Sequence, residues 1–403
     1  MAATQVLTDP LAAPCADAET AAAVAALLRD RSVVPLFQPI VDLKTGAVVG
    51  VEALARGPAG GPLERPDQLF AAAHRTGQLG AVDLLCAERA LECALEAPDV
   101  PPLVFVNAEP AVLDQPISPR LLELLVSGLP FRVVLEYTER ALSTVPAGLL
   151  RIAGLAHAMG NGIALDDVGA DPMSLAFLPF VEPDVIKLDM HLLRHPSAPA
   201  TVEVCTAVTA AAARSGAMIV AEGIETAADV ATALALGAHW GQGWHFGRPA
   251  HLADLAMPAV DRTPPLRPAR PGLHQPAGSP FSVAATSGAR PAEDAVIRRT
   301  LDRMTAAVDG QGHAVVLGSY SSGEQATSWG PYAQRATRQA TFTAMLRPDS
   351  GAEPFAGESC LVVVTPNYAA ALCRDSASGA LVQTEDRDMV TSIGRVLLQR
   401  LKP

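Results

Sequence analysis

The chain has 403 residues, a formal net charge of −12 at pH 7, and a composition of 49% hydrophobic and 18% charged residues. This length predicts two or three domains, with enough apolar residues for a sizeable core. The acidity argues against general binding of nucleic acid polymers or membranes, so a phosphate-bearing ligand would need bound cations or a local basic site.

Cysteine usage and hydropathy predict a reduced, cytoplasmic setting. None of the six cysteines stands at C-x-x-C spacing, and most have apolar neighbours, which argues against a zinc site. The N-terminus lacks a basic leader, and no apolar run is long enough to cross a bilayer.

The first 255 residues alternate between strands and helices. After a flexible lead over residues 1–19, strands are predicted at 35–43, 48–56, 102–107, 132–139, 163–169, 185–190 and 217–225. Helices are predicted at 21–31, 66–76, 83–97, 120–127, 146–159, 201–215 and 226–236, with a helical turn at 174–178 that Pro179 ends. The first two strands form a hairpin, and 237–249 closes the unit. The pattern predicts an α/β (β/α) barrel over residues 20–256.

The composition changes after this unit. Residues 257–292 are rich in proline and lack periodicity, which predicts a semi-rigid linker whose arginines Arg262, Arg267 and Arg270 keep it soluble. Residues 293–403 are predicted to form a smaller C-terminal α/β domain. Its expected helices are 297–308, 334–345 and 386–401, and its expected strands are 314–318 and 360–365.

Polar residues mark the ends of the predicted barrel strands. They are Glu52, Asn107, Glu136, Asp166, Lys187 and Glu222. A barrel gathers the carboxyl ends of its strands at one face, where its active site is built. Taken alone, Asp166-Asp167 could be a capped turn, and Glu52 with Arg56 an exposed ion pair.

These residues predict a particular chemistry. Hard oxygen ligands from Glu52, Asn107, Glu136, Asp166 and Asp167 suit Mg²⁺ or Mn²⁺. Two such ions can activate water for an in-line displacement at phosphorus. Lys187 can orient the water, and Glu222 can act as general base or as a further ligand. The residues therefore predict metal-assisted phosphodiester hydrolysis.

The motifs resemble those of the EAL domain family, phosphodiesterases of the bacterial second messenger cyclic di-GMP. The resemblance runs from Gln38-Pro-Ile-Val-Asp and Val51-Glu-Ala-Leu-Ala-Arg56 to Gly241-Gln-Gly-Trp-His-Phe-Gly-Arg-Pro249, through motifs around Asn107, Glu136, Asp166, Lys187 and Glu222. It implies a modified TIM (β/α)8 barrel with an antiparallel first strand, a homodimer, and hydrolysis of cyclic di-GMP to linear pGpG.

The resemblance also implies residue roles. Glu52, Asn107, Glu136, Asp166 and Asp167 would bind two Mg²⁺ or Mn²⁺ ions; Lys187, Glu222 and Gln242 would be catalytic; Gln38 and Arg56 would contact substrate; Asp189 and Glu139 would support the metal shell and the neighbouring loop.

One loop departs from the family pattern. The family usually has Asp-Asp-Phe-Gly-Thr-Gly-Tyr-Ser-Ser-Leu, whereas this chain has Asp166-Asp-Val-Gly-Ala-Asp-Pro-Met-Ser-Leu175. The altered segment 168–173 motivates an alternative, a receptor that binds cyclic di-GMP without turnover. A third alternative is a scaffold, although buried carboxylates without metal would be costly to fold. The C-terminal region resembles the DICT domain, a sensory module, at Ser279-Pro-Phe, Thr365-Pro-Asn-Tyr and Thr384-Glu-Asp-Arg.

Overall fold

The computed structural model describes most of the chain. The described residues are 12–99, 101–109, 117–138, 143–255, 266–268, 270–286, 294–309, 313–320, 323–346, 355 and 357–401. Within these ranges no helix is both long enough and apolar enough to cross a lipid bilayer.

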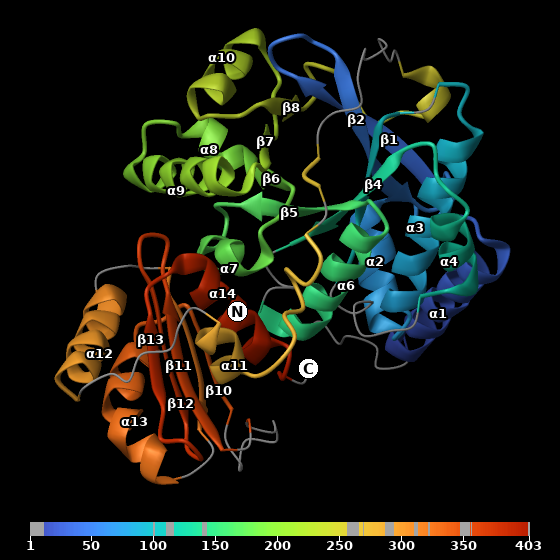
Figure 1. Ribbon diagram of the computed structural model, residues 1–403. Coiled ribbons are helices and arrows are strands. Elements are labelled where there is room, and N and C mark those ends of the chain that lie inside the picture. Colours follow the sequence, from blue (N-terminus) through green and yellow to red (C-terminus); the bar gives the residue numbers. More distant parts are fainter. Residues whose placement is uncertain are drawn as a thin grey trace, which may run out of the picture.

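Eight strands close into a barrel (Figure 1). They are β1 (Val34–Asp42), β2 (Val48–Arg56), β3 (Leu103–Asn107), β4 (Arg132–Tyr137), β5 (Gly162–Val168), β6 (Val185–Leu188), β7 (Met218–Ala221) and β8 (Trp240–Gln242). β1 is antiparallel to both β2 and β8, and the other neighbours are parallel. The predicted barrel with an antiparallel first strand is confirmed.

The hairpin turn explains why β1 runs against its neighbours. The Asp42 carboxylate accepts hydrogen bonds from the backbone N–H groups of Lys44 and Thr45, and Gly46 has φ +74°. These features return the chain within five residues, too few for the crossover that a parallel pair requires.

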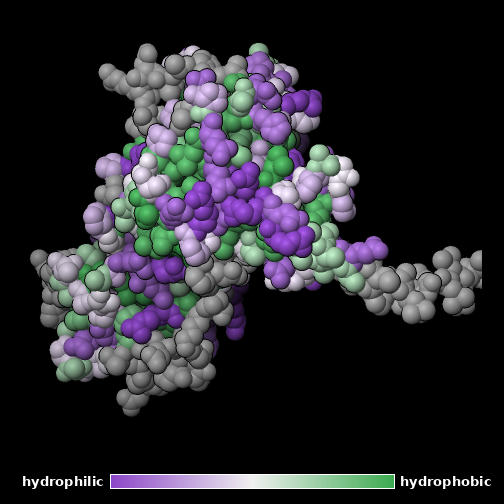
Figure 2. Space-filling model, turned by 90° about the vertical axis from the view of Figure 1, so that its right-hand side faces the viewer, coloured by the Kyte–Doolittle hydropathy of each residue, from purple (hydrophilic) through white to green (hydrophobic). Residues whose placement is uncertain are grey.

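Helices surround the barrel. They are α1 (Ala12–Asp30), α2 (Pro66–Arg75), α3 (Leu79–Glu96), α4 (Pro119–Val126), α6 (Pro146–Ala158), α7 (Pro172–Val181), α8 (Met190–Arg194), α9 (Pro199–Ser215) and α10 (Ala227–Ala235), with a 3-10 turn, η2, at Leu252–Asp254. Figure 2 views the side with α1, α3 and α4, where hydrophilic and hydrophobic residues lie in adjoining patches. Ion pairs of Glu92 with Arg31, Arg89 and Arg120 tie this side together.

The C-terminal region forms a five-stranded sheet in the order β10-β9-β11-β12-β13. The strands are β9 (Val315–Tyr320), β10 (Phe342–Leu346), β11 (Glu358–Val364), β12 (Ala369–Asp375) and β13 (Leu381–Thr384). The helices are α11 (Pro280–Ala285), α12 (Asp294–Asp309), α13 (Gly323–Thr337) and α14 (Arg387–Leu398).

The two faces of this sheet have different partners. Side chains alternate along a strand, so Val316 and Val363 join the core under α12 and α13. Val315, Val362 and Ile393 of α14 belong to a core that also contains Phe177 of α7. The barrel and the C-terminal sheet therefore share one continuous hydrophobic core across α7 and α14 (Figure 1).

Several local predictions were wrong. The helix expected at 334–345 ends at Thr337, and β10 follows, because β-branched and aromatic residues there pair with β9. α7 continues through Pro179, because tertiary packing buries its apolar residues. The strands β12 and β13 were missed. α1 begins at Ala12, inside the segment assigned to a flexible lead.

The predicted role of the arginines at 257–292 was also wrong. Arg267 is mostly buried and its Nε donates to Asp184 Oδ1 at 3.2 Å, while Arg270 pairs with Glu182. Leu266, 8% exposed, joins the apolar core inside the barrel. These residues anchor the connection to the barrel rather than keep it in solvent. Arg262 lies outside the described residues.

Candidate active site

Lys187 stands at the centre of a cluster of carboxylates near the carboxyl ends of the barrel strands. Its side chain is 1% exposed, and its Nζ lies 3.3 Å from Glu52 Oε2, 3.0 Å from Glu136 Oε1, 3.0 Å from Asp166 Oδ1 and 2.8 Å from Glu222 Oε1. Parallel strand ends meet at one rim, so residues up to 170 positions apart in the chain converge. The structure thus brings together five of the predicted site residues.

Amide side chains orient the Glu52 carboxylate. Asn107 Nδ2 donates to Glu52 Oε1 at 3.1 Å, and Gln242 Nε2 donates to Glu52 Oε2 at 2.6 Å. Gln242 Nε2 also lies 3.2 Å from Gln38 Oε1, and Gln38 Nε2 donates to the Gly247 carbonyl at 3.0 Å. Gln38 is the cross-strand partner of Glu52 in the β1–β2 hairpin, which explains its place beside the cluster.

A bulge at the end of β5 presents Asp166 and Asp167. Successive side chains of a regular strand point to opposite faces, so adjacent aspartates would normally diverge. The β5–β6 register shifts between Leu165 and Val168, and Asp167 has φ +52°, a left-handed conformation. Oxygen atoms of Asp166, Asp167 and Glu222 consequently lie within 4.8 Å of one another.

Burial and crowding set the protonation of the cluster. Burial, and then the nearby Glu52 carboxylate, hold the pKa of Glu136 well above its ordinary value. Burial raises the pKa of Glu222 to about 8. Burial alone would lower the pKa of Lys187, but Asp166, Glu136, Glu222 and Glu52 hold it well above its ordinary value. Without bound metal, Lys187 therefore stays charged, and Glu136 and Glu222 favour the neutral form.

The donor set fits divalent cations that prefer oxygen ligands. If all are ionised, five carboxylates (Glu52, Glu136, Asp166, Asp167 and Glu222) and one ammonium leave an excess of four negative charges, which two divalent ions would balance. Glu136 Oε2 and Gln242 Oε1 are buried with no hydrogen-bond partner among the described residues. An orphaned buried oxygen is costly, and a metal ion or its water would satisfy it. Mg²⁺ and Mn²⁺ suit such oxygens better than zinc does.

A cleft opens above the cluster. It is lined by Gln38, Glu52, Asp167, Asp189, Met190, Glu222, Gly223, Glu225, Gln242, Gly243 and Trp244. Trp244 is 56% exposed, and the Arg248 guanidinium lies 4.1 Å from its ring centroid. Sequence reasoning missed this aromatic platform, although Trp244 stands two residues after Gln242 in the motif Gly241–Pro249. The signal available in the sequence was a tryptophan two residues from a predicted site residue.

The remaining predicted residues have distinct positions. Asp189 accepts a hydrogen bond from the His191 N–H at 2.7 Å and caps α8 while lining the cleft. Arg56 lies beside Asn107 and Glu136 in an adjoining hollow, and its Nη1 donates to the Ala55 carbonyl. Glu139 lies outside the described residues.

The altered loop is locally well formed. Val168 is fully buried, and Asp171 caps α7 by accepting a hydrogen bond from the Met173 N–H at 2.7 Å. Pro172 occupies the first turn of α7, where backbone N–H groups make no intrahelical hydrogen bond, so the lack of an N–H costs nothing. Three of the residues that depart from the family pattern, Asp171, Pro172 and Met173, therefore cap and begin a helix that follows the aspartate pair after four intervening residues.

A closed eight-stranded barrel with one antiparallel strand and an acidic cluster at its mouth defines the class of modified TIM barrels. The family model described as "EAL domain" matches residues 21–249, more than half of the chain, and the chain belongs to the EAL domain family.

Curated relatives agree with this assignment. The chain is 30% identical over 234 residues to "Probable cyclic di-GMP phosphodiesterase PdeB" of Escherichia coli (strain K12), covering 57% of this chain and 45% of that protein. It is 33% identical over 243 residues to "Bifunctional diguanylate cyclase/cyclic di-GMP phosphodiesterase MucR" of Pseudomonas aeruginosa, covering 57% and 34%. The chain thus spans less than half the length of these two relatives.

Solved structures share the fold. The EAL domain of Xanthomonas citri FimX, solved in complex with c-diGMP, aligns with a TM-score of 0.55 at 19% identity, covering 61% of this chain and 99% of that one. The FimX EAL domain of Pseudomonas aeruginosa, bound to c-di-GMP, aligns with a TM-score of 0.52 at 20% identity, covering 60% and 100%. At these identities the likeness establishes the barrel fold.

Proposed function

We propose that this protein hydrolyses cyclic di-GMP to linear pGpG in a reaction that depends on Mg²⁺ or Mn²⁺. The observation that carries the proposal is the convergence of carboxylates from four strands on Lys187, with Asp166, Asp167 and Glu222 oxygens gathered beside it. Family membership and the names of the relatives supply the substrate class.

The chemistry divides among named side chains. Glu52, Asn107, Glu136, Asp166 and Asp167 would hold two divalent ions, which supply an activated water and charge stabilisation at the phosphate. Lys187 Nζ would orient the attacking water by donating a hydrogen bond. Glu222 would accept its proton as the P–O bond to the 3′ oxygen breaks, and Gln242 would hold the water in place.

Substrate contacts follow from the rim of the cleft. Gln38 and Arg56 would contact the phosphate and sugar groups of cyclic di-GMP. Trp244 would stack on a guanine, because an exposed aromatic face binds a nucleobase through π contact.

A test of turnover separates this proposal from its alternatives. Purified protein with Mn²⁺ and cyclic di-GMP should produce pGpG, measured by chromatography. Asp166→Asn should lose activity, whereas the matched control Asp67→Asn, on an exposed part of α2, should keep it. Absence of pGpG above the Asp166→Asn background would refute the proposal.

The second candidate function is a receptor that binds cyclic di-GMP without turnover. The altered segment 168–173 favours it, because this segment joins the proposed metal pair to α7 and includes the first two residues of that helix. Micromolar binding with no pGpG would select this candidate, and lack of binding would exclude both.

We also propose that residues 293–403 form a DICT-like regulatory domain, joined by 257–292 to a catalytic barrel at 20–256. Contacts of the C-terminal domain with both ends of α7 support regulation of the barrel by this domain. His313 Nδ1 lies 3.1 Å from the Pro172 carbonyl, and Arg395 Nε donates to the Phe180 carbonyl at 2.8 Å. Since α7 begins after only four residues beyond the aspartate pair, a shift of the C-terminal domain would reach the metal ligands through one helix.

A homodimer is proposed on the family resemblance alone. Light scattering of the full chain tests it, and a monomeric mass at micromolar concentration would contradict it.

A further inference from the structure

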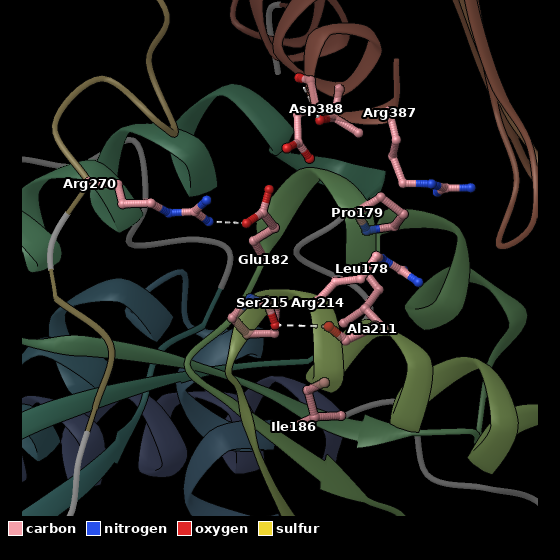
Figure 3. Close-up of a pocket in the computed structure, with 12 residues that line it drawn as sticks. Leu178, Pro179, Glu182, Ile186, Ala211, Arg214, Ser215, Arg270, Arg387 and Asp388 are labelled. Carbon is pink, nitrogen blue, oxygen red and sulfur yellow. Dashed lines mark hydrogen bonds and ion pairs between the residues drawn. The ribbon is translucent and has the colours of Figure 1, made fainter. Parts of the chain in front are cut away.

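A second cleft lies between the barrel and the C-terminal domain, away from the mouth of the barrel (Figure 3). Its walls come from the end of α7, the end of α9, the connection at Arg270 and the first turn of α14. Nothing in the proposed phosphodiesterase reaction uses the cleft.

The cleft is basic although the chain is acidic. Arg214, Arg270 and Arg387 line it, against the carboxylates of Glu182 and Asp388. Glu182 is already engaged, because Arg395 Nη2 lies 2.7 Å and Arg267 Nη1 lies 3.6 Å from its carboxylate and Arg270 also pairs with it. In the ranges that the structure describes, neither Arg214 nor Arg387 forms an ion pair. Asp388 lies near Arg387, but within the described residues it forms no ion pair with Arg214 or with Arg387.

Arg387 is fixed in place with an unused donor. Its Nη2 donates to the carbonyls of Thr365 and Pro366, each at 3.0 Å. Its Nη1 is buried and has no acceptor among the described residues. Burial lowers the pKa of Arg387, the nearby positive charge of Arg214 lowers it further, and the Asp388 carboxylate opposes this in part. A buried, unpaired guanidinium N–H beside a second cation is a costly arrangement that an anionic oxygen would relieve.

The two cations come from different parts of the chain. Arg214 belongs to α9 of the barrel, and Arg387 begins α14 of the C-terminal domain. Figure 3 shows both guanidinium groups on the same side of Pro179. Phosphate presents oxygens in a tetrahedral arrangement with up to two negative charges, so one group can accept from both arginines. A carboxylate has only two oxygens, which lie in one plane, so a phosphate matches the two arginines better.

We propose that this cleft binds a small molecule carrying a phosphate group, held by Arg214 from the barrel and Arg387 from the C-terminal domain. Binding would bridge the two parts of the chain. Binding would affect turnover through α7. This effect rests on the proposed function, whereas the binding site itself does not.

Calorimetric titration with inorganic phosphate and pyrophosphate tests the site. The full chain is used after treatment with EDTA, so that no metal at the barrel mouth can capture the probe. We expect saturable binding in the parent and at least about tenfold weaker binding in Arg214→Gln, whose exposed side chain can be changed without disturbing the core. Arg387→Lys should also weaken binding, because lysine cannot span the two carbonyls and the ligand.

The matched control is Arg65→Gln, an exposed arginine beside α2 that pairs with Asp67. It should bind like the parent. Absence of binding in the folded parent, equal binding in Arg214→Gln, or selective binding of citrate instead of the phosphate probes would overturn the proposal. Because the titration involves no turnover, an inactive phosphodiesterase would leave its result unchanged.

Discussion

Lys187 Nζ and Asp166 Oδ1 lie 3.0 Å apart, and the same ammonium also contacts Glu52, Glu136 and Glu222. A single cation thus holds four buried or half-buried carboxylates together. The cluster is structural in the metal-free protein and catalytic in the proposed reaction, so changes at Lys187 should affect both stability and turnover.

Lys187→Met should destabilise the metal-free protein by about 3–5 kcal/mol, because the substitution leaves buried carboxylates without their cation. Turnover should fall by about 100-fold or more. Denaturant unfolding with EDTA and with Mn²⁺ measures the first effect, and Mn²⁺ should restore part of the lost stability. Equal stability of the variant and the parent in EDTA would contradict the role given to Lys187.

Asp167→Asn should lower turnover by about 100-fold or more while changing the free energy of unfolding by less than about 1 kcal/mol. Asparagine tolerates the left-handed φ of +52° but lacks the carboxylate charge. The matched control is Asp171→Asn, which can still cap α7 through the Met173 N–H. Loss of activity in both variants would point to a general disturbance of the loop.

Trp244→Ala should weaken cyclic di-GMP binding by about 1–3 kcal/mol, the value of one base–aromatic stack. Trp244→Phe should retain most of the affinity. Val126→Ala, at another exposed apolar side chain far from the cleft on α4, serves as the control. The affinity is measured by titration with cyclic di-GMP, with Ca²⁺ in place of Mn²⁺. An unchanged affinity for cyclic di-GMP in Trp244→Ala would contradict the stacking role of Trp244.

Gly394→Ala should disturb the contact between α14 and α7, because a Cβ there would overlap the Phe180 ring. The control is Gly330→Ala in α13, where a Cβ meets no atom within 4 Å apart from the neighbouring residues in the chain. If the C-terminal domain regulates the barrel, the initial rate should change in Gly394→Ala alone. Identical rates in parent, variant and control would argue against regulation through α7.

Asp83 should make stability fall as pH rises. Burial raises its pKa from 3.8 to about 7, so the folded state holds the proton more tightly than the unfolded state between these values. Its contribution is therefore most favourable below pH 4 and is lost between pH 4 and 7. Asp83→Asn should remove this slope and be more stable at pH 8 by a few kcal/mol. If the stability of variant and parent changed with pH in parallel, the raised pKa assigned to Asp83 would be contradicted.

Much of the barrel followed from local patterns. Glu52, Asn107, Asp166 and Glu222 each follow an apolar run, and strand alternation predicts where such residues emerge. The C-terminal region was harder, because the five residues of β10 are too few for periodicity to separate a strand from a helix, and they form a strand by pairing with β9. The connection at Arg267 looked polar and aperiodic, and its burial depends on Asp184, 83 positions earlier.

By itself, the sequence determined the order of strands and helices in the barrel, the oxygen-bearing side chains at the strand ends and the family resemblance, because these depend on short-range spacing. Only the tertiary structure decided that Lys187 contacts four carboxylates. It also decided that Arg395 donates a hydrogen bond to the Phe180 carbonyl near the end of α7, and that Arg214 and Arg387 share a cleft. The physical reason is that ion pairs and packing across long sequence separations depend on how the elements assemble, which no local periodicity records.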